Sequence, residues 1–494
     1  MISVFKKAFS HSIKPTQTKL LINGKLVNSL SGKTFETINP STGQVICSVQ
    51  EAGVEDTHLA IAAARKAFDE GPWRKESAST RCKVLLAIAD KIENHRDELA
   101  MLETLDNGKP LFFSHFDVQF AIDAFRYYAG WTDKIHGQTI PISGPYLCYT
   151  REEPVGVCGQ IVPWNFPLLM AAFKIAPALA CGNTTILKPA ELTPLTALRL
   201  GELIHEVGIP DGVLNVVSGY GDVAGDALVR SRDVDKIAFT GSTNVGKQIL
   251  MNGGIKRVTL ELGGKNPHIV MQDADLDLAV GLTHFSAFLN SGQVCMAGSR
   301  TFVHEAIYDA FVEKAVAAAK AKKTGDPFEQ GIENGPQISQ KQTDKIMGYI
   351  ESGVKEGARL LTGGKRMDRP GYFIEPTVFA DVTDDMLIAK EEIFGPVMNI
   401  IKFKTIDEVI RRANATQYGL VSGVVTKDLD TAIKVSNGVQ AGLVFVNTWM
   451  AQNSATPFGG YKNSGFGREL GEISLKNYLE TKTVIIKRPG LSLP

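Results

Sequence analysis

The segment "DKIAFTGSTNVGKQIL", residues 235–250, decides the fold of this chain. Its first half is a run of apolar, β-forming residues, and its second half has the apolar spacing of a helix, with Gly241 and Gly246 near the junction. This order of strand, tight turn and helix predicts a βαβ unit. Because the N-terminal amides of a helix attract phosphate, the turn is also a candidate anion site, although it matches neither GxxxxGK[ST] nor GxGxxG.

The same alternation extends on both sides of this segment. "TTILKPAE" (184–191) and "GVLNVVSG" (212–219) are predicted strands that flank a helix, "TPLTALRLGELIHEVG" (193–208), for which Thr193 is the predicted N-cap. "RVTLELGG" (257–264) is a further strand. Such alternation predicts an α/β fold with a parallel sheet, and in such sheets ligands bind at the carboxyl ends of the strands.

Other segments complete a chain of two or three domains, the number expected for 494 residues. "TKLLINGKLVNS" (18–29) predicts a β-hairpin, because Asn23 and Gly24 accept the left-handed turn that it needs. The remaining predicted elements are helices near 55–70, 81–104, 275–290, 305–323, 342–356 and 406–414, and strands near 420–426 and 443–447.

The composition excludes several classes of protein. Lys plus Arg and Asp plus Glu both number 53, so no net charge favours nucleic acid or an acidic membrane, and a small molecule is the expected ligand. The apolar run 166–173 stops at Lys174, which is too short for a transmembrane helix. The six cysteines form no CxxC pair, which argues against a zinc site or a disulfide framework and favours a reducing compartment.

The N-terminus bears on the cellular compartment. Several lysines precede the first acidic residue, Glu36, and Ile2, Phe5, Phe9 and Ile13 share one face of a helical wheel. This pattern is typical of a basic amphipathic targeting segment, whereas a frayed basic tail without arginine is the plainer explanation. Because only a short extension precedes the hairpin, the cytoplasm is the expected compartment, and the mitochondrial matrix is the alternative.

Residues 288–298, "FLNSGQVCMAG", place one cysteine in a polar run bounded by glycines. The thiolate is the reactive form, so a nucleophilic cysteine needs polar, partly exposed surroundings and a base nearby. Gly292 and Gly298 would let backbone N–H groups approach a substrate at Cys295. The competing interpretation is a structural cysteine in the core, which suits the other five cysteines better.

Two polar residues in apolar segments are candidates to assist Cys295. Glu261 lies between Leu260 and Leu262, and apolar surroundings raise a carboxyl pKa towards the range of a general base near neutral pH. The alternative is an edge-strand glutamate that points to water. Asn165 in "VPWNFP" could donate to a developing oxyanion, or could merely cap a helix.

A further pair of residues suits a dinucleotide. Lys188 and Glu191, in "LKPAE", follow a predicted strand, where an acidic residue can bind the ribose 2′-hydroxyl and repel a 2′-phosphate. The pair favours NAD over NADP, although Lys188 would weaken that preference. "SGYGDVAG" (218–225) nearly matches the GxGxxG fingerprint, but an ordinary glycine loop explains it better.

Together these segments resemble the aldehyde dehydrogenase superfamily, and most of all its NAD-dependent class 1/2 branch. The resemblance runs from about Leu20 to Lys487 and rests on motifs in the family's order: "PWNFP", "LKPAE", "FTGSTNVG", "TLELGGKNP", "FLNSGQVCMAGSR", "GPQI", "KEEIFGPV" and "PFGGYKNSGFGREL". It implies a homotetramer, built as a dimer of dimers, whose chains have three parts. These are a Rossmann-like parallel-sheet NAD-binding domain (1–131 and 155–263), a second α/β catalytic domain (264–465) and a small β oligomerisation element (132–154 and 466–494).

The resemblance also implies roles for single residues. Cys295 would be the nucleophile, Glu261 the general base, and Asn165 with the backbone N–H of Cys295 the oxyanion hole. NAD would be held by Val162, Pro163, Trp164, Lys188, Glu191, Gly241, Ser242, Thr243, Gly246, Glu392 and Phe394. The aldehyde tunnel would be lined by Phe166, Leu169, Phe173, Gln452 and Phe458. No metal is implied.

This chain departs from the family's pattern at the expected tunnel. Val294 and Met296 flank the cysteine, whereas relatives often carry further cysteines there. Phe173 stands where tryptophan is common, and Gln452 where several relatives have an aromatic residue. Tunnel width and polarity decide which aldehyde fits, so the substrate's identity stays open.

The implied reaction is the oxidation of an aldehyde to a carboxylate. Cys295 would attack the carbonyl carbon, hydride would pass from the thiohemiacetal to NAD, and Glu261 would activate the water that hydrolyses the thioester. One alternative is an acylating dehydrogenase that passes the thioester to coenzyme A, which Glu261 argues against. Another is a catalytically silent protein of the same fold, which the joint presence of Cys295, Glu261 and Asn165 argues against.

Overall fold

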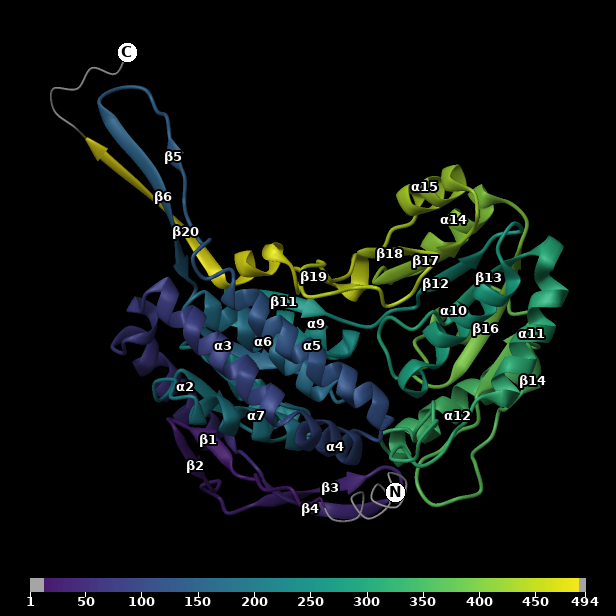
Figure 1. The fold of residues 1–494 in the computed structure, drawn as a ribbon, viewed down its shortest axis with the longest axis horizontal. Coiled ribbons are helices and arrows are strands. Elements are labelled where there is room, and N and C mark those ends of the chain that lie inside the picture. The colour runs from purple at the N-terminus through teal and green to yellow at the C-terminus, as the bar shows by residue number, and fades with distance from the viewer. Residues whose placement is uncertain (1–12, 488–494) are drawn as a thin grey trace.

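The computed structural model describes residues 13–487, which form two lobes around two large sheets, with two small sheets beside them (Figure 1). The predicted amphipathic targeting segment lies, apart from Ile13, outside the described residues. No helix within the described range is long and apolar enough to cross a membrane. Within the same range, no group of three His, Cys, Asp or Glu side chains could hold a metal ion.

The first large sheet has the strand order β19-β11-β10-β7-β8-β9-β1-β2. Its five central strands run parallel, while β19, β1 and β2 pair antiparallel at the two edges. The strands are β1 (Leu20–Ile22), β2 (Lys25–Val27), β7 (Val157–Ile161), β8 (Thr184–Lys188), β9 (Leu214–Val216), β10 (Lys236–Thr240), β11 (Arg257–Glu261) and β19 (Gly465–Phe466).

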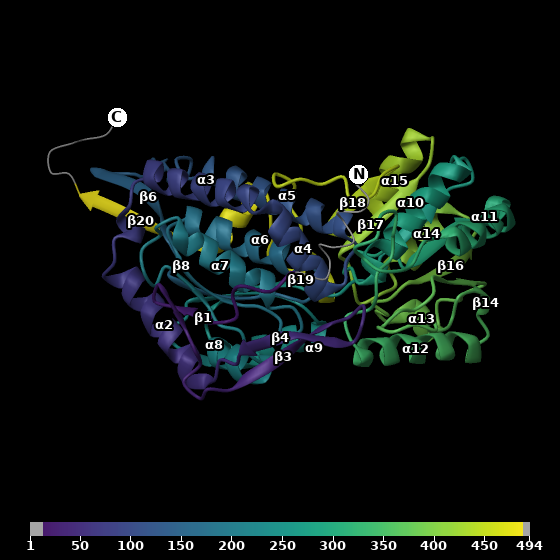
Figure 2. The same ribbon diagram turned by 60° about the horizontal axis from the view of Figure 1, so that its bottom comes forward.

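Helices cover both faces of this sheet, which explains why its central strands are apolar throughout (Figure 2). Ile186 packs into a core shared with α2, α8 and α9, whereas its neighbour Leu187 packs into a core shared with α6 and α7. The helices of this lobe are α2 (Val54–Asp69), α3 (Ala78–Asn94), α4 (Arg96–Asn107), α5 (Leu111–Ala129), α6 (Pro167–Ala180), α7 (Leu195–Glu206), α8 (Asp226–Arg230) and α9 (Thr243–Asn252).

The second large sheet has the order β14-β15-β16-β13-β12-β17-β18, and all its pairs are parallel except β14 with β15. Its strands are β12 (Pro267–Val270), β13 (Arg300–His304), β14 (Arg359–Thr362), β15 (Thr377–Ala380), β16 (Val397–Phe403), β17 (Val421–Val425) and β18 (Leu443–Val446). Its helices are α10 (Leu276–Phe288), α11 (Tyr308–Ala321), α12 (Gln340–Lys355), α13 (Leu387–Lys390), α14 (Ile406–Asn414) and α15 (Leu429–Gly438).

A three-stranded antiparallel sheet projects from the first lobe (Figure 1). It consists of β5 (Thr139–Ile140), β6 (Tyr146–Pro154) and β20 (Leu479–Lys487), while β3 (Thr34–Asn39) and β4 (Gln44–Gln50) form a separate hairpin. The predicted fold class, two α/β units with a small β element, is therefore confirmed. The exact domain limits and the roles assigned to the parts stay predictions.

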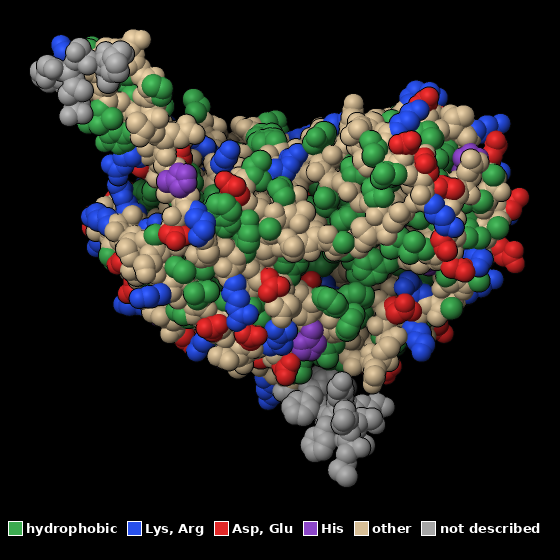
Figure 3. Space-filling view, turned by 45° about the horizontal axis from the view of Figure 1, so that its top comes forward, with side chains coloured by type: hydrophobic (Ala, Val, Ile, Leu, Met, Phe, Trp, Pro, Cys, Tyr) green, Lys and Arg blue, Asp and Glu red, His purple; other side chains and the backbone are tan. Residues whose placement is uncertain are grey.

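The crevice for a ligand follows from the strand order. From β7 the chain steps outward to β8 and β9, and then returns to the other side of β7 to form β10 and β11. The connections that leave β7 and β10 therefore diverge at their carboxyl ends, which is where open α/β sheets bind ligands. The face of the molecule in Figure 3 is hollowed near its middle, and hydrophobic side chains gather around the hollow.

Most predicted elements are present within a few residues of their expected limits, including the hairpin, in which Asn23 and Gly24 have φ values of 51° and 71°. The single helix predicted near 81–104 is wrong. His95, at φ −110° and ψ 20°, ends α3, and its backbone N–H bonds back to Ile92 O, after which α4 begins. The apolar spacing continues across this break, so the spacing alone could not reveal it.

The predicted N-cap of the helix at 193–208 is also wrong. Pro194 occupies the cap position, and the carboxylate of Asp106, on α4, accepts the backbone N–H of Leu195 at 3.0 Å. An acceptor from another helix thus replaces the local cap. It satisfies one of the free amides at the start of α7 and fixes α4 against α7.

We expect Gly465→Ala to destabilise the fold far more than Gly208→Ala. Both glycines have a left-handed φ, of 112° and 90°, but a Cβ at Gly465 would lie 2.0 Å from the Leu260 carbonyl oxygen, whereas open space surrounds Gly208. Backbone strain costs about 1 kcal/mol in both variants, and the clash in β19 adds roughly 1–3 kcal/mol. Thermal unfolding of the two variants checks this; equal losses in melting temperature would contradict it.

Candidate active site

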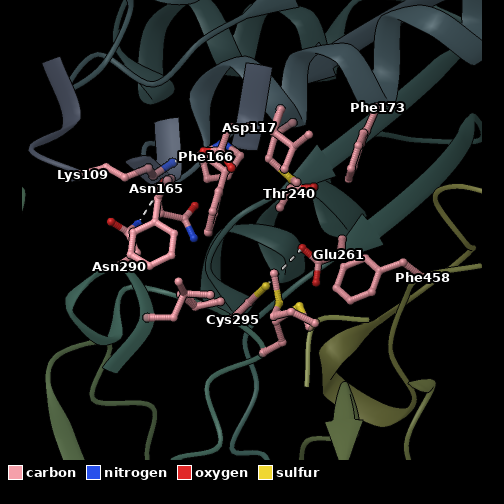
Figure 4. Close-up of a pocket in the computed structure, with 18 of the residues that line it drawn as sticks. Lys109, Asp117, Asn165, Phe166, Phe173, Thr240, Glu261, Asn290, Cys295 and Phe458 are labelled. Atoms are coloured by element: carbon pink, nitrogen blue, oxygen red, sulfur yellow. Dashed lines mark hydrogen bonds and ion pairs between the residues drawn. The ribbon is translucent and has the colours of Figure 1, made fainter. Parts of the chain in front are cut away.

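A cavity of about 690 Å³ lies where the carboxyl ends of β7, β10 and β11 meet the second lobe. The segments that follow these strands contribute Asn165, Gly241 and Glu261 to its wall. Cys295 enters from the second lobe, on the turn between α10 and β13 (Figure 4). The structure therefore brings the three predicted catalytic residues together in one cavity.

The turn that carries Cys295 has an unusual backbone. Asn290, Ser291 and Gly292 all have a left-handed φ, of 47°, 55° and 74°. Side-chain hydrogen bonds hold the turn, since Gln293 Nε2 donates to Asn290 O at 3.1 Å and Gln293 Oε1 accepts from the Ile338 N–H at 2.9 Å. The buried side chain of Gln293 thus holds the strained backbone of residues 290–292 in place.

The two glycines near Cys295 have a role different from the expected one. A Cβ at Gly292 would lie 1.9 Å from Gly395 O, and a Cβ at Gly298 would lie 2.4 Å from Ser286 Oγ. These glycines let the turn pack closely against neighbouring chain segments. The expected approach of backbone N–H groups to a substrate at Cys295 stays a prediction.

Glu261 ends β11 and is only 3% exposed, because β11 lies between β10 and β19. The alternative of an edge-strand glutamate that points to water is therefore wrong. Its Oε2 lies 3.9 Å from Cys295 Sγ, and its Oε1 has no hydrogen-bond partner among the described residues. Figure 4 shows Glu261 and Cys295 side by side in the cavity. Burial, and then the nearby Glu469 carboxylate, raise the pKa of Glu261 well above its usual value.

The thiol of Cys295 shares this electrostatic setting. Burial of the sulfur, and next the Glu261 carboxylate, raise the pKa of the Cys295 thiol well above its usual value. A thiolate beside an ionised Glu261 would place two like charges in a low-dielectric site, which opposes loss of the thiol proton. The thiol must therefore lose its proton before it can act as a nucleophile.

Asn165 lies beside the turn of Cys295. One hydrogen of its amide is donated to Gln293 O at 2.9 Å, and Asn290 Nδ2 donates to Asn165 O at 3.2 Å. The first residue before α6 is Phe166, with no side-chain capping bond, so the alternative role of Asn165 as a helix cap is wrong. An amide NH₂ has a second hydrogen, which leaves Asn165 one donor for a ligand in the cavity.

A buried network behind Glu261 was not predicted from the sequence. Lys174, on α6, donates from Nζ to Thr240 Oγ1 at 2.6 Å and forms an ion pair with Glu469. It is fully buried, and its positive charge partly opposes the rise in the pKa of Glu261. The only sign of this network in the sequence is Lys174 itself, a charged residue directly after the apolar run at 166–173.

The predicted cofactor residues fall into two groups. Those that line the cavity are Pro163, Trp164, Gly241, Ser242, Glu392 and Phe394. Val162, Lys188, Glu191, Thr243 and Gly246 lie outside its lining. Lys188 ends β8, the strand next to β7, and its Nζ lies 3.7 Å from Glu191 Oε2, so this pair occupies the same edge of the sheet.

The contacts of these residues separate those that could bind a ligand from those that serve packing. Glu392 accepts the Gly264 N–H at 2.9 Å, and the rings of Trp164 and Phe394 meet edge to face at 5.2 Å. Thr243 Oγ1, in the first turn of α9, is buried without a hydrogen-bond partner among the described residues. A Cβ at Gly246 would lie 2.7 Å from Leu262, so Gly246 serves helix–strand packing.

All five predicted tunnel residues line the cavity, and Figure 4 shows Phe166, Phe173 and Phe458 among them. Sequence reasoning missed other apolar parts of this wall. They are Phe112, Phe113, Phe116 and Phe120 on α5, Met170 on α6 and Phe285 on α10. The available signal was the spacing of aromatic residues in "LFFSHFDVQF", which was not interpreted.

Comparisons with known proteins give consistent results. The family model described as "Aldehyde dehydrogenase family" matches residues 26–484. The chain is 58% identical to the mitochondrial aldehyde dehydrogenase family 2 member B4 of Arabidopsis thaliana, over 96% of this chain and 89% of that protein. It is 56% identical to the mitochondrial benzaldehyde dehydrogenase of Antirrhinum majus, over 98% of this chain and 92% of that protein.

A solved structure matches equally well. The NAD⁺ complex of aldehyde dehydrogenase from Bacillus cereus superimposes with a TM-score of 0.94 and 50% identity. The match covers 97% of this chain and 98% of that one. The arrangement of both lobes and the small sheet is therefore shared with that enzyme.

We expect alkylation of Cys295 by iodoacetamide to accelerate roughly tenfold per pH unit between about pH 7 and pH 9, without a plateau. The reason is the raised pKa of its thiol, which keeps the thiolate a minor species throughout that range. Peptide mass spectrometry of the ligand-free protein follows the modification, and Cys295→Ala gives the background from the half-buried Cys47 and Cys82. A plateau below about pH 8 would contradict the electrostatic account.

Proposed function

The chain belongs to the aldehyde dehydrogenase family, as its motifs predicted, and we propose that Cys295, Glu261 and Asn165 carry its reaction. The enzyme oxidises an aldehyde to a carboxylate with NAD. One observation carries the assignment of roles: a thiol and a buried carboxyl 3.9 Å apart in the wall of a cavity. Among the described cysteines, Cys295 alone contacts a carboxyl group, since Cys47 lies beside a threonine hydroxyl and Cys158 and Cys181 lie beside backbone carbonyl oxygens.

The residues present fit NAD as the cofactor. Thr243 offers a buried hydroxyl without a partner at the start of α9, where free helix amides favour a phosphate. Glu392 and the rings of Trp164 and Phe394 would hold the nicotinamide half, and Lys188 and Glu191 the adenosine ribose. When bound, NAD supplies the acceptor for the hydride.

The first step is attack of Cys295 Sγ on the carbonyl carbon. The Cys295 thiol loses its proton to solvent before the attack, because only the thiolate is nucleophilic. The second amide hydrogen of Asn165 and the Cys295 backbone N–H stabilise the oxyanion; that N–H has no other acceptor in the part of the chain that the structure describes.

The second step releases the product. Glu261 takes a proton from water, which attacks the thioester carbon and frees the carboxylate, and Asn165 again stabilises the oxyanion. Lys174 keeps the pKa of Glu261 from rising further, so that the carboxylate form stays accessible. A buried base beside the sulfur favours hydrolysis over transfer of the acyl group to coenzyme A.

The projecting sheet supports self-association into a homotetramer. β6 and β20 expose Leu147, Ile485 and Ile486, with Ile485 59% exposed. Apolar side chains on a thin sheet that projects from the molecule are typical of a protein interface. Sedimentation velocity of the full chain tests this, and a monomer at micromolar concentration would contradict it.

For the compartment, we favour the mitochondrial matrix over the cytoplasm. Relatives at 58% and 56% identity carry the word mitochondrial in their names, and the basic amphipathic N-terminus is consistent with import. Fractionation of cells that express a C-terminally tagged chain decides between the two. Recovery in the cytosol alone would contradict import.

We expect Cys295→Ala to abolish oxidation and Glu261→Gln to permit one turnover followed by arrest. In the second variant the nucleophile remains, but the loss of a general base slows deacylation by about 10²- to 10⁴-fold. Rapid mixing with NAD and propanal should therefore show a burst of NADH close to one equivalent per active site. Steady turnover of Glu261→Gln at the wild-type rate would contradict the role of Glu261.

We expect the wild-type enzyme to prefer NAD, and Glu191→Gln to reduce that preference by about tenfold or more. The carboxylate repels a 2′-phosphate, and its loss leaves the positive Lys188 alone at that position. Initial rates with NAD and NADP give the ratio of kcat/KM values. An unchanged ratio in the variant would show that Glu191 does not face the ribose.

A further inference from the structure

Helix α5 presents a line of phenylalanines to the cavity. Phe112, Phe116 and Phe120 recur every four residues and therefore share one face of the helix. The rings of Phe112 and Phe116 meet edge to face at 5.0 Å, and Phe120 makes the same contact, also at 5.0 Å, with Phe173 on α6. We call these four residues the phenylalanine stripe.

The stripe runs from the surface towards the sulfur. Phe112 and Phe116 are 66% and 60% exposed, whereas Phe173 is fully buried, and all four line the same cavity as Cys295. Figure 4 shows the inner end, with Phe173 and Phe166 in the wall around Cys295. At 1.5 Å of rise per residue, the part of the stripe on α5 alone extends over about 12 Å.

The opposite wall continues this apolar path. Phe285, on α10, is 36% exposed and lines the cavity with Leu289, Val294 and Met296. Aromatic rings left in water at the mouth of an enzyme cavity lower stability and solubility unless a ligand covers them. A two- or three-carbon aldehyde bound at Cys295 would be too short to reach Phe112 or Phe116.

The charged side chains of this wall have partners or repel anions. Lys109 pairs with Asp117 and Glu103, and its Nζ lies 4.0 Å from the centre of the Phe166 ring. Asp123, which also lines the cavity, accepts a hydrogen bond from Gln119 at 2.8 Å. An aldehyde with an anionic end would therefore lose its hydration along the stripe, where the nearby lysine is already paired. The other lysine of the cavity, Lys345, lies beside Glu392, one of the predicted cofactor residues.

We propose that the phenylalanine stripe selects aldehydes with an extended, uncharged apolar body, either a long alkyl chain or an aryl group on an unsaturated chain. The carbonyl carbon reaches Cys295 while the body of the substrate lies along Phe173, Phe120 and Phe116. This proposal rests on the proposed function and specifies its substrate class. It makes Phe116 and Phe120 specificity-determining residues.

The first test is a panel of substrates for the wild-type enzyme with NAD. Propanal, decanal, cinnamaldehyde and succinic semialdehyde differ in length, aromaticity and charge, and NADH formation gives kcat/KM for each. We expect decanal or cinnamaldehyde to exceed propanal by at least about tenfold, since each group buried in an apolar pocket adds to discrimination. Whichever of the two is better identifies the alkyl or the aryl form of the substrate.

The second test changes the stripe itself. Phe116→Ala should lower the ratio of kcat/KM for the better long substrate to that for propanal by about tenfold. The matched control is Leu429→Ala on α15, which removes a side chain of similar exposure, 72%, outside the cavity and should leave the ratio as in the wild type. Phe116 is exposed, so its loss leaves the core intact.

The outcomes separate this proposal from the proposed function. If propanal and succinic semialdehyde are oxidised as well as the long aldehydes, or if Phe116→Ala leaves the ratio unchanged, the stripe does not select substrate and the inference fails while the enzyme assignment stands. If the folded protein oxidises no aldehyde with NAD, the proposed function itself fails. A preference for long aldehydes that Phe116→Ala removes supports the inference.

Discussion

The site depends on the short connection between the two large sheets. β11 is fixed between β10 and β19 and ends at Glu261, and the chain then passes through Gly263 and Gly264 into β12. Within this connection the Gly264 N–H binds Glu392, and Asn266 Nδ2 donates to Cys295 O at 2.8 Å. A Cβ at Gly264 would lie 2.5 Å from Cys295 O. One connection therefore holds the proposed base Glu261, the proposed nucleophile Cys295 and the predicted cofactor residue Glu392 at fixed separations.

Cys295 and Glu261 lie close enough to act on the same substrate atom, and the same closeness opposes ionisation of both groups. Burial raises the pKa of both Cys295 and Glu261, and a charge on either residue opposes a charge on the other. Behind Glu261, in the first lobe, Lys174 and Glu469 form an ion pair. The positive charge of Lys174 lowers the pKa of Glu261, whereas the nearby Glu469 carboxylate raises it by more. The pKa of Glu261 is therefore raised overall, which suits a general base.

Short-range patterns in the sequence were sufficient to predict much of the fold and part of the site. Strand and helix alternation predicted the parallel sheets, Asn23 and Gly24 predicted the hairpin, and motifs identified Cys295 and the family. The rest depends on contacts between distant segments. The break at His95 and the cap that Asp106 provides for α7 involve no local signal that periodicity detects. Gly292 and Gly298 are explained only by the chain segments packed against them, and the partners of Lys174 lie on other elements. The line of Phe112, Phe116 and Phe120 was visible as spacing, but only the fold shows that it faces the cavity.

The central claim is that Cys295 carries the acyl group and that Glu261 releases it. Intact-protein and peptide mass spectrometry of Glu261→Gln, quenched in acid after mixing with NAD and an aldehyde, tests this claim most directly. The account predicts one added acyl mass, confined to the peptide that contains Cys295, and its absence when NAD is omitted. An acyl group on another residue, or no acyl group in a variant that has formed NADH, would contradict the account.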